Sequence, residues 1–263
     1  MITPLPSRAG YWGATRAPRY SILFALPLLL LYEILAAALT RTAAVQVRNG
    51  ADVLLKSLFV AFGGLDGLMV FGVILLGTGT VLVWRDLRRH GWRLQGRVFA
   101  GMLGESVAYA LLLGIVAGLL TAIVLGGVPI LAGAAAAHAA DFSTASQAAD
   151  AGARMDLPTQ LMISLGAGLY EELLFRVILV SGLALLARRG LGWRPAPAAG
   201  FAVVTGAVIF SAFHYIGPYG DAFEAGSFTF RLIAGLIFSG LYVVRGFGIT
   251  AWTHALYDVF LTV

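Results

Sequence analysis

The sequence contains no cysteine among its 263 residues, and only 12% of its residues are charged. The lack of cysteine excludes disulfides, thiolate catalysis and cysteine-ligated metal within the chain. The low charge excludes an ordinary soluble domain, because 59% of the residues are hydrophobic and most segments would have no side to face water. The chain also lacks a polar linker long enough to separate domains. We therefore expect residues 1–263 to form one integral membrane domain.

Apolar segments of bilayer-spanning length recur along the chain. A transmembrane helix needs about 20 predominantly apolar residues. The pattern predicts an all-α, polytopic membrane bundle of about seven to eight transmembrane helices. Seven segments are long or apolar enough to span a membrane: 20–39, 67–84, 98–125, 159–187, 198–216, 229–244 and 248–263. The last two of these are short.

Two further segments have a less regular pattern. In residues 41–66 charged and apolar residues alternate, which predicts an amphipathic helix at the outer membrane interface. The alanine-rich segment 132–151 is compatible with a short helix or an irregular loop. The first apolar run is longer than the core of a signal peptide and lacks a small-residue cleavage site, so we expect it to be retained as the first helix.

Positive charge lies in blocks between the apolar segments. Residues 85–97 contain five arginines, and three more lie in residues 188–194. The positive-inside rule places these loops, and the N-terminus, in the cytoplasm. The acidic loops 126–158 and 217–228 then face outward. The richness in alanine and arginine suggests a bacterial chain, so we expect it in the inner membrane. Since the basic residues follow the apolar segments, they indicate membrane orientation and no nucleic-acid partner.

The strongest chemical signal is a pair of carboxylates within an apolar segment. Glu171 and Glu172 are followed by Arg176, all inside the run 157–187. Ionisable groups at membrane depth are costly and usually carry function. On a helix Glu172 and Arg176 share a face, whereas Glu171 is rotated by about 100°. One glutamate can therefore be structural while the other is chemically active, although a single structural cluster of all three groups is the alternative.

Two histidines follow in later apolar segments. His214 ends the sequence Phe210-Ser-Ala-Phe-His, and His254 begins the sequence His-Ala-Leu-Tyr-Asp258. A single histidine at membrane depth is often a packing residue. Two of them, together with a carboxylate pair, favour a site that activates water, because both groups can exchange a proton near neutral pH.

The motifs Glu-Glu-x-x-x-Arg, Phe-x-x-x-His and His-x-x-x-Asp, in this order, resemble those of the CPBP or Abi family of intramembrane proteases, which includes the type II CAAX prenyl endopeptidases. The resemblance covers residues 157–263, which we expect to carry the catalytic core. It implies cleavage of a membrane-associated protein or peptide within the lipid bilayer.

By this resemblance, Glu171 is the general base, His214 is its partner, and His254 with Asp258 stabilises the oxyanion. The family commonly has asparagine where this chain has Asp258. An ionised carboxylate cannot donate to an oxyanion, so Asp258 must be protonated or must orient His254. The resemblance also implies supporting positions: Glu172, Arg176 and Phe210.

A metal is the main chemical alternative. Glu171, His214 and His254 could hold zinc with an open position for water. The resemblance favours a glutamate mechanism without a cofactor, and this is our prediction. Helix lengths also pose a problem, because His254 is much nearer to the start of its segment than Glu171 and His214 are to the cytoplasmic ends of theirs. A re-entrant stretch at residues 245–248 or a strong tilt would bring the three to one depth.

Other classes of protein fit the sequence less well. An aspartyl protease would need Asp258 to face a second aspartate, and Asp221 lies in a polar loop. Ser211 lacks the context of a nucleophile elbow. A proton-coupled transporter or a non-catalytic membrane protein could use buried carboxylates as a relay, in which case Glu33 and Glu105 would join the glutamate pair.

Overall fold

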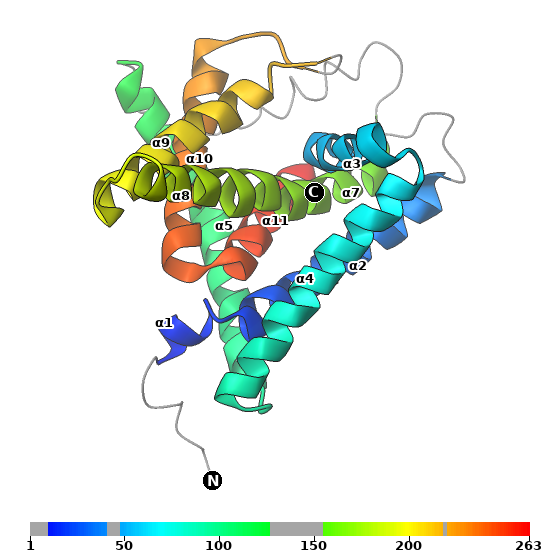
Figure 1. Cartoon of the computed structure of the whole chain (residues 1–263). Coiled ribbons are helices and arrows are strands. Elements are labelled where there is room, and N and C mark those ends of the chain that lie inside the picture. The colour runs from blue at the N-terminus through cyan, green and yellow to red at the C-terminus, as the bar shows by residue number, and fades with distance from the viewer. Residues whose placement is uncertain (1–9, 41–47, 127–154, 218–219) are drawn as a thin grey trace.

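The computed structural model describes residues 10–40, 48–126, 155–217 and 220–263. Within these ranges every regular element is helical, so the predicted all-α class is confirmed (Figure 1). The expected helix or loop at 132–151 lies outside the described residues. The elements are α1 (Tyr11–Ala14), α2 (Pro18–Thr40), α3 (Gly50–Gly63), α4 (Asp66–His90), α5 (Gly96–Val124), α7 (Leu157–Gly166), η1 (Ala167–Val180), α8 (Ser181–Arg189), α9 (Pro195–Phe213), α10 (Ala225–Arg245) and α11 (Phe247–Thr262).

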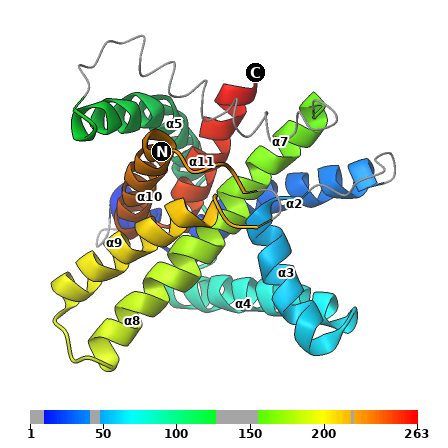
Figure 2. The ribbon, with the colours of Figure 1, turned by 90° about the horizontal axis from the view of Figure 1, so that it is seen from above.

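All seven segments expected to span the membrane form helices, although α9 ends at Phe213, before the end of the segment expected at 198–216. Among the described residues, five helices are long and apolar enough to cross a bilayer: α2, α4, α5, α9 and α10. The segment predicted at 159–187 is the continuous run of α7, η1 and α8, which crosses the molecule as one long rod (Figure 2). At 16 residues, α11 is shorter than a bilayer requires.

Local sequence explains where several helices begin and end. Asn49 caps α3 and Asp156 caps α7, each through a side-chain oxygen that accepts a backbone N–H. Pro195 opens α9, where its missing N–H is no loss. The chain turns between α10 and α11 at Gly246, whose φ of 88° favours glycine.

The turn at Gly246 explains how a histidine near the start of α11 reaches the site. Arg245, the last residue of α10, is 1% exposed and forms an ion pair with Glu105 of α5. Gly248 packs directly on α2, where its N–H donates to Ser21 Oγ at 2.8 Å. Since α11 begins inside the protein, His254 lies beside η1 although it is only the eighth residue of its helix.

Helix α11 lies at the centre of the bundle. It packs against α2, α5, α7, α10 and η1. The approach of η1 is very close, because a Cβ atom on Gly168 would lie 2.5 Å from Ala255 Cβ and 2.6 Å from its backbone nitrogen. Glycine at this crossing lets the two backbones meet, as is common between membrane helices. The carboxylate pair of η1 is thereby brought to the histidine of α11.

Candidate active site

The two glutamates lie on η1, a stretch of π-helix that runs from Ala167 to Val180. In a π-helix each backbone N–H donates to the carbonyl five residues earlier, where an α-helix uses the carbonyl four residues earlier. At the end of the stretch Ser181 N–H donates in this way to Arg176 O. Such π-helical segments are rare and are frequently found at functional sites. Both carboxylates are buried, with 8% of Glu171 and none of Glu172 exposed.

The two oxygens of Glu171 face different partners. Oε1 accepts a hydrogen bond of 2.8 Å from Asn49 Nδ2 at the start of α3. Oε2 lies 4.0 Å from His214 Nε2 at the end of α9. The predicted pairing of Glu171 with His214 is therefore present in the structure, at a distance longer than a direct hydrogen bond.

The ring of His214 has a defined tautomer when it is neutral. Its Nδ1 lies 2.9 Å from the backbone oxygen of Phe210. A carbonyl oxygen can only accept, so Nδ1 carries the proton of this hydrogen bond. In the neutral ring Nε2 is then the acceptor nitrogen, and it is the atom that faces Glu171. The His214 side chain is 25% exposed, so this part of the site is open to the surroundings.

Glu172 forms a separate, sealed cluster. Its Oε1 lies 3.1 Å from Arg176 Nη1 and 2.7 Å from His254 Nδ1. Arg176 is 1% exposed, and its guanidinium lies 4.3 Å from the centroid of the Phe210 ring and 5.3 Å from that of the Phe238 ring. The geometry thus separates the glutamates as the sequence predicted, with Glu172 in the ion pair and Glu171 directed elsewhere.

His254 lies between the carboxylates of Glu172 and Asp258. Besides its contact with Glu172, its Nε2 lies 3.7 Å from Asp258 Oδ2, one turn further along α11. Each ring nitrogen of His254 therefore faces a carboxylate. The Asp258 side chain is 27% exposed, so the site is closed at Glu172 and open near Asp258 and His214.

Aromatic rings frame the histidines. Phe238 of α10 stacks on the His254 ring with centroids 4.4 Å apart and planes at 24°. Phe210 presents its edge or face to both His214 and His254, at 5.0 and 6.3 Å between centroids. These contacts restrict the orientation of both imidazoles.

Sequence reasoning missed two residues of this constellation, Asn49 and Phe238. A signal existed for Asn49, because an asparagine directly before an apolar helical run is a typical N-cap. Its second contact, to Glu171, depends on how α3 packs. Phe238 carried no signal that distinguishes it from the other apolar residues of α10.

The residues of the competing hypotheses have other partners. Glu33 pairs with Lys56 at 3.0 Å, and Asp221 pairs with Arg231 at 2.6 Å. The Ser211 hydroxyl donates to the Phe228 carbonyl at 2.7 Å. Glu105 forms a bidentate ion pair with the buried Arg245. None of these side-chain contacts is made with a histidine side chain, although the backbone N–H of Asp221 donates to the His214 carbonyl at 2.9 Å.

No group of three or more His, Cys, Asp and Glu residues in the described ranges is arranged to hold a metal ion. The set that could have formed a zinc site comprises Glu171, His214 and His254. In the structure the near partner of His254 is Glu172, whereas that of Glu171 is Asn49.

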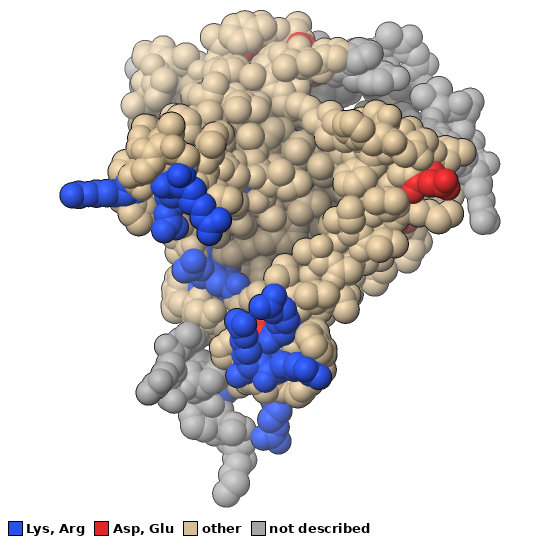
Figure 3. All heavy atoms as spheres, in the orientation of Figure 1, with Lys and Arg blue, Asp and Glu red and all other residues tan. Residues whose placement is uncertain are grey.

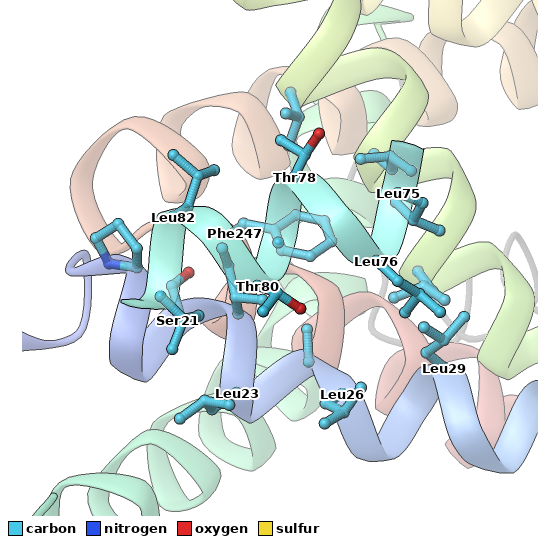
Figure 4. A pocket seen from close by; sticks show the side chains of 18 of the residues that line it. Ser21, Leu23, Leu26, Leu29, Leu75, Leu76, Thr78, Thr80, Leu82 and Phe247 are labelled. Carbon is cyan, nitrogen blue, oxygen red and sulfur yellow. The ribbon is translucent and has the colours of Figure 1, made fainter. Parts of the chain in front are cut away.

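A large apolar cavity lies on another side of η1. It has a volume of about 1010 Å³ and opens between α4 and the long rod, where the surface is hollowed (Figure 3). Leucines of α2 and α4 and Phe247 line it (Figure 4). It reaches η1 at Tyr170 and Leu173, next to the glutamate pair, but neither glutamate lines it.

Residues 153–260 match the family model described as type II CAAX prenyl endopeptidase Rce1-like. Over these residues the chain is similar to the Rce1-like family. The resemblance inferred from the three motifs is thereby confirmed, and the match supports an intramembrane endopeptidase of the CAAX type. No curated protein and no solved structure shows a significant match to the chain. Asn49 lies outside the matched residues, so the Rce1-like region does not by itself contain every side chain of the constellation.

Proposed function

We propose that this protein is a glutamate-type intramembrane endopeptidase that hydrolyses a peptide bond in a membrane-associated protein or peptide. The observation that carries the proposal is the pairing of Glu171 Oε2 with His214 Nε2 at 4.0 Å. A water molecule at ordinary hydrogen-bond distances of about 2.8 Å from both atoms fits this separation. Both atoms can accept a proton from that water, so it would be held and polarised between them.

In this mechanism Glu171 Oε2 takes a proton as the water oxygen adds to the scissile carbonyl carbon. The carbonyl oxygen becomes an oxyanion. Glu172 holds the ring of His254 through Nδ1 at 2.7 Å, so Nε2 is the nitrogen that would donate to the oxyanion. Glu171 then returns the proton to the amide nitrogen as the C–N bond breaks, which leaves a carboxylic acid and an amine, and the acid passes its proton to the amine to give a carboxylate and an ammonium group. Asp258 Oδ2 lies 3.7 Å from His254 Nε2, beyond hydrogen-bond distance, so it leaves Nε2 available to the oxyanion and would orient the ring through its charge.

The helices of the first half of the chain support the proposal that 1–263 acts as one membrane domain. Helices α2 and α5 pack directly on α11, and α2 packs on α7. The core at 157–263 would therefore lose its supporting surfaces if it were separated from them. A proton relay receives less support, because Glu33 and Glu105 are each held in an ion pair.

Peptide hydrolysis without metal is the first prediction. In liposomes, the purified protein is expected to cleave a set of quenched fluorescent peptides that carry an apolar membrane anchor. Activity should survive exhaustive chelation, and the zinc content should be below one atom per chain, because a carboxylate and a histidine polarise the water directly. If His214 and His254 were zinc ligands, chelation would abolish cleavage and added zinc would restore it. That outcome would replace the glutamate mechanism by a metal mechanism.

Orientation in the membrane is the second prediction. Basic side chains gather in two groups, at the C-terminal end of α4 and at the tip of α8 (Figure 3). We propose that both groups and the N-terminus face the cytoplasm of a bacterial cell. Because the chain has no cysteine, single cysteines can be introduced without background. Cysteine at Arg93 or Arg194 should resist an impermeant thiol reagent in intact cells, whereas cysteine at Ala222, an exposed residue of the loop before α10, should react. The reverse labelling would invert the topology.

A further inference from the structure

The start of α3 contributes a side chain to the candidate base. Asn49 is 4% exposed and uses both ends of its amide. Oδ1 accepts the backbone N–H of Ala51 at 2.9 Å and that of Asp52 at 3.4 Å, and Nδ2 donates to Glu171 Oε1 at 2.8 Å. The two chain positions are 122 residues apart.

The chemistry of its partners fixes the orientation of this amide. Backbone N–H groups only donate, so the atom that caps α3 must be the oxygen. An ionised carboxylate only accepts, so the atom beside Glu171 must be the NH₂ group. Neither contact survives if the amide is flipped, so Asn49 has a single orientation.

A cluster of buried and half-buried charges holds Asn49 in place. One turn after it, the fully buried Asp52 accepts from Tyr32 of α2 at 2.7 Å and pairs with Arg48 and Lys56 at 3.0 and 2.6 Å. Lys56 also pairs with Glu33, which accepts from Tyr170, the residue before Glu171. The cluster therefore links α2, α3 and η1 at the point where Asn49 meets Glu171.

The backbone of α7 allows this close approach. A Cβ atom on Gly166 would lie 2.9 Å from Asn49 Cβ and 2.5 Å from Tyr32 Cε2. Real Cβ atoms do not come so close to both groups without a shift of the neighbours. The start of α3 lies where α2 passes the long rod (Figure 2), with glycine on the rod at the contact.

We propose that Asn49 is a positioning residue that orients Glu171 for catalysis. By binding Oε1, it leaves Oε2 as the oxygen that faces His214 and the attacking water. It also donates to the carboxylate, which helps hold the charged group in a buried position. The inference rests on the proposed hydrolytic function, and it adds a residue of the N-terminal half of the chain to the catalytic machinery.

Variants that keep the cap but lose the donor test this role. In Asn49→Ser the hydroxyl can still cap α3, but the side chain is too short to reach Glu171. In Asn49→Asp the cap is also kept, and a carboxylate oxygen replaces the NH₂ group beside Glu171. Each variant is assayed in liposomes with the peptide that the wild-type protein cleaves, together with its melting temperature.

We expect both variants to melt close to the wild type. For Asn49→Ser, kcat should fall about 10- to 100-fold, the loss typical when the hydrogen-bond partner that orients a metal-binding side chain is removed. KM should change less than about twofold, because Asn49 acts on the base and binds no substrate. Asn49→Asp should lose more activity, since its carboxylate would face that of Glu171 and the two would repel each other.

Asp156→Ala is the matched control, because Asp156 caps α7 through Thr159 N–H at 3.1 Å. We expect this variant to melt earlier and to keep its kcat per folded molecule. If Asn49→Ser has the wild-type kcat, the role of Asn49 is refuted and the proposed hydrolytic function still stands. The inference would also be overturned if neither cap-preserving variant folded, because Asn49 would then be needed for structure. A wild-type protein that cleaves no peptide would overturn the proposed function and the inference together.

Discussion

Replacing Glu171 by glutamine is expected to lower peptide cleavage at least about 10²- to 10⁴-fold, the range supplied by a positioned general base. Glutamine keeps the size of the side chain and an oxygen that can accept from Asn49 Nδ2. It removes the group that takes the proton of the attacking water. The loss should therefore appear in kcat, measured in liposomes with an anchored fluorescent peptide.

The fold should survive this change, because Glu171 takes no part in the ion pair of Glu172 and Arg176. The melting temperature of Glu171→Gln is expected to be close to that of the wild type. Glu224→Gln, which removes a carboxylate at an exposed position before α10, serves as the matched control and should cleave normally. Turnover at the wild-type rate in Glu171→Gln would end the glutamate mechanism.

The motif residues could be predicted from the sequence because each is chemically unusual in its setting. A charged or imidazole side chain in an apolar segment is costly and usually has a function, so Glu171, His214 and His254 can be picked out from the sequence alone. Their spacing within each motif is local. The structure adds that they converge, with Glu171 beside His214 and Glu172 beside His254.

The contribution of Asn49 could not be predicted in the same way. In residues 41–66 charges alternate with apolar residues, which predicts an amphipathic helix at the membrane interface. In the structure the described part of this segment places Asp52 and Lys56 in an ion cluster against α2 and η1. An asparagine before a helix predicts a cap, but only the tertiary packing shows what its NH₂ group meets.

The π-helical geometry of η1 also leaves no mark in the sequence. Glu172 and Arg176 pair across one turn, as the α-helical spacing predicts, although the backbone hydrogen bonds follow a wider pattern. The turn at Gly246 was easier to anticipate, since the depth of His254 required an interruption near residues 245–248. What the sequence could not specify is that this interruption is a single glycine packed against Arg16, just before α2, and against Ser21 of α2.

The largest loss of stability is expected from breaking the pair of Glu172 and Arg176. Both side chains are at most 1% exposed. Among the described residues, the guanidinium of Arg176 has no hydrogen-bond partner, so the ion pair of 3.1 Å with Glu172 and the faces of two phenylalanines compensate its charge. Removing either partner leaves an uncompensated buried charge, which typically costs about 3–5 kcal/mol.

We therefore expect Arg176→Ala and Glu172→Ala to give little folded protein and a strongly lowered melting temperature in detergent. Arg188→Ala, which removes an exposed arginine of α8, is the matched control and should melt like the wild type. The double variant Glu172→Gln with Arg176→Met should recover part of the loss, because no unpaired charge remains and glutamine can still accept from His254 Nδ1. Wild-type melting of both single alanine variants would refute the ion-pair assignment. A double variant less stable than either of them would show that the charges themselves hold η1 to α11.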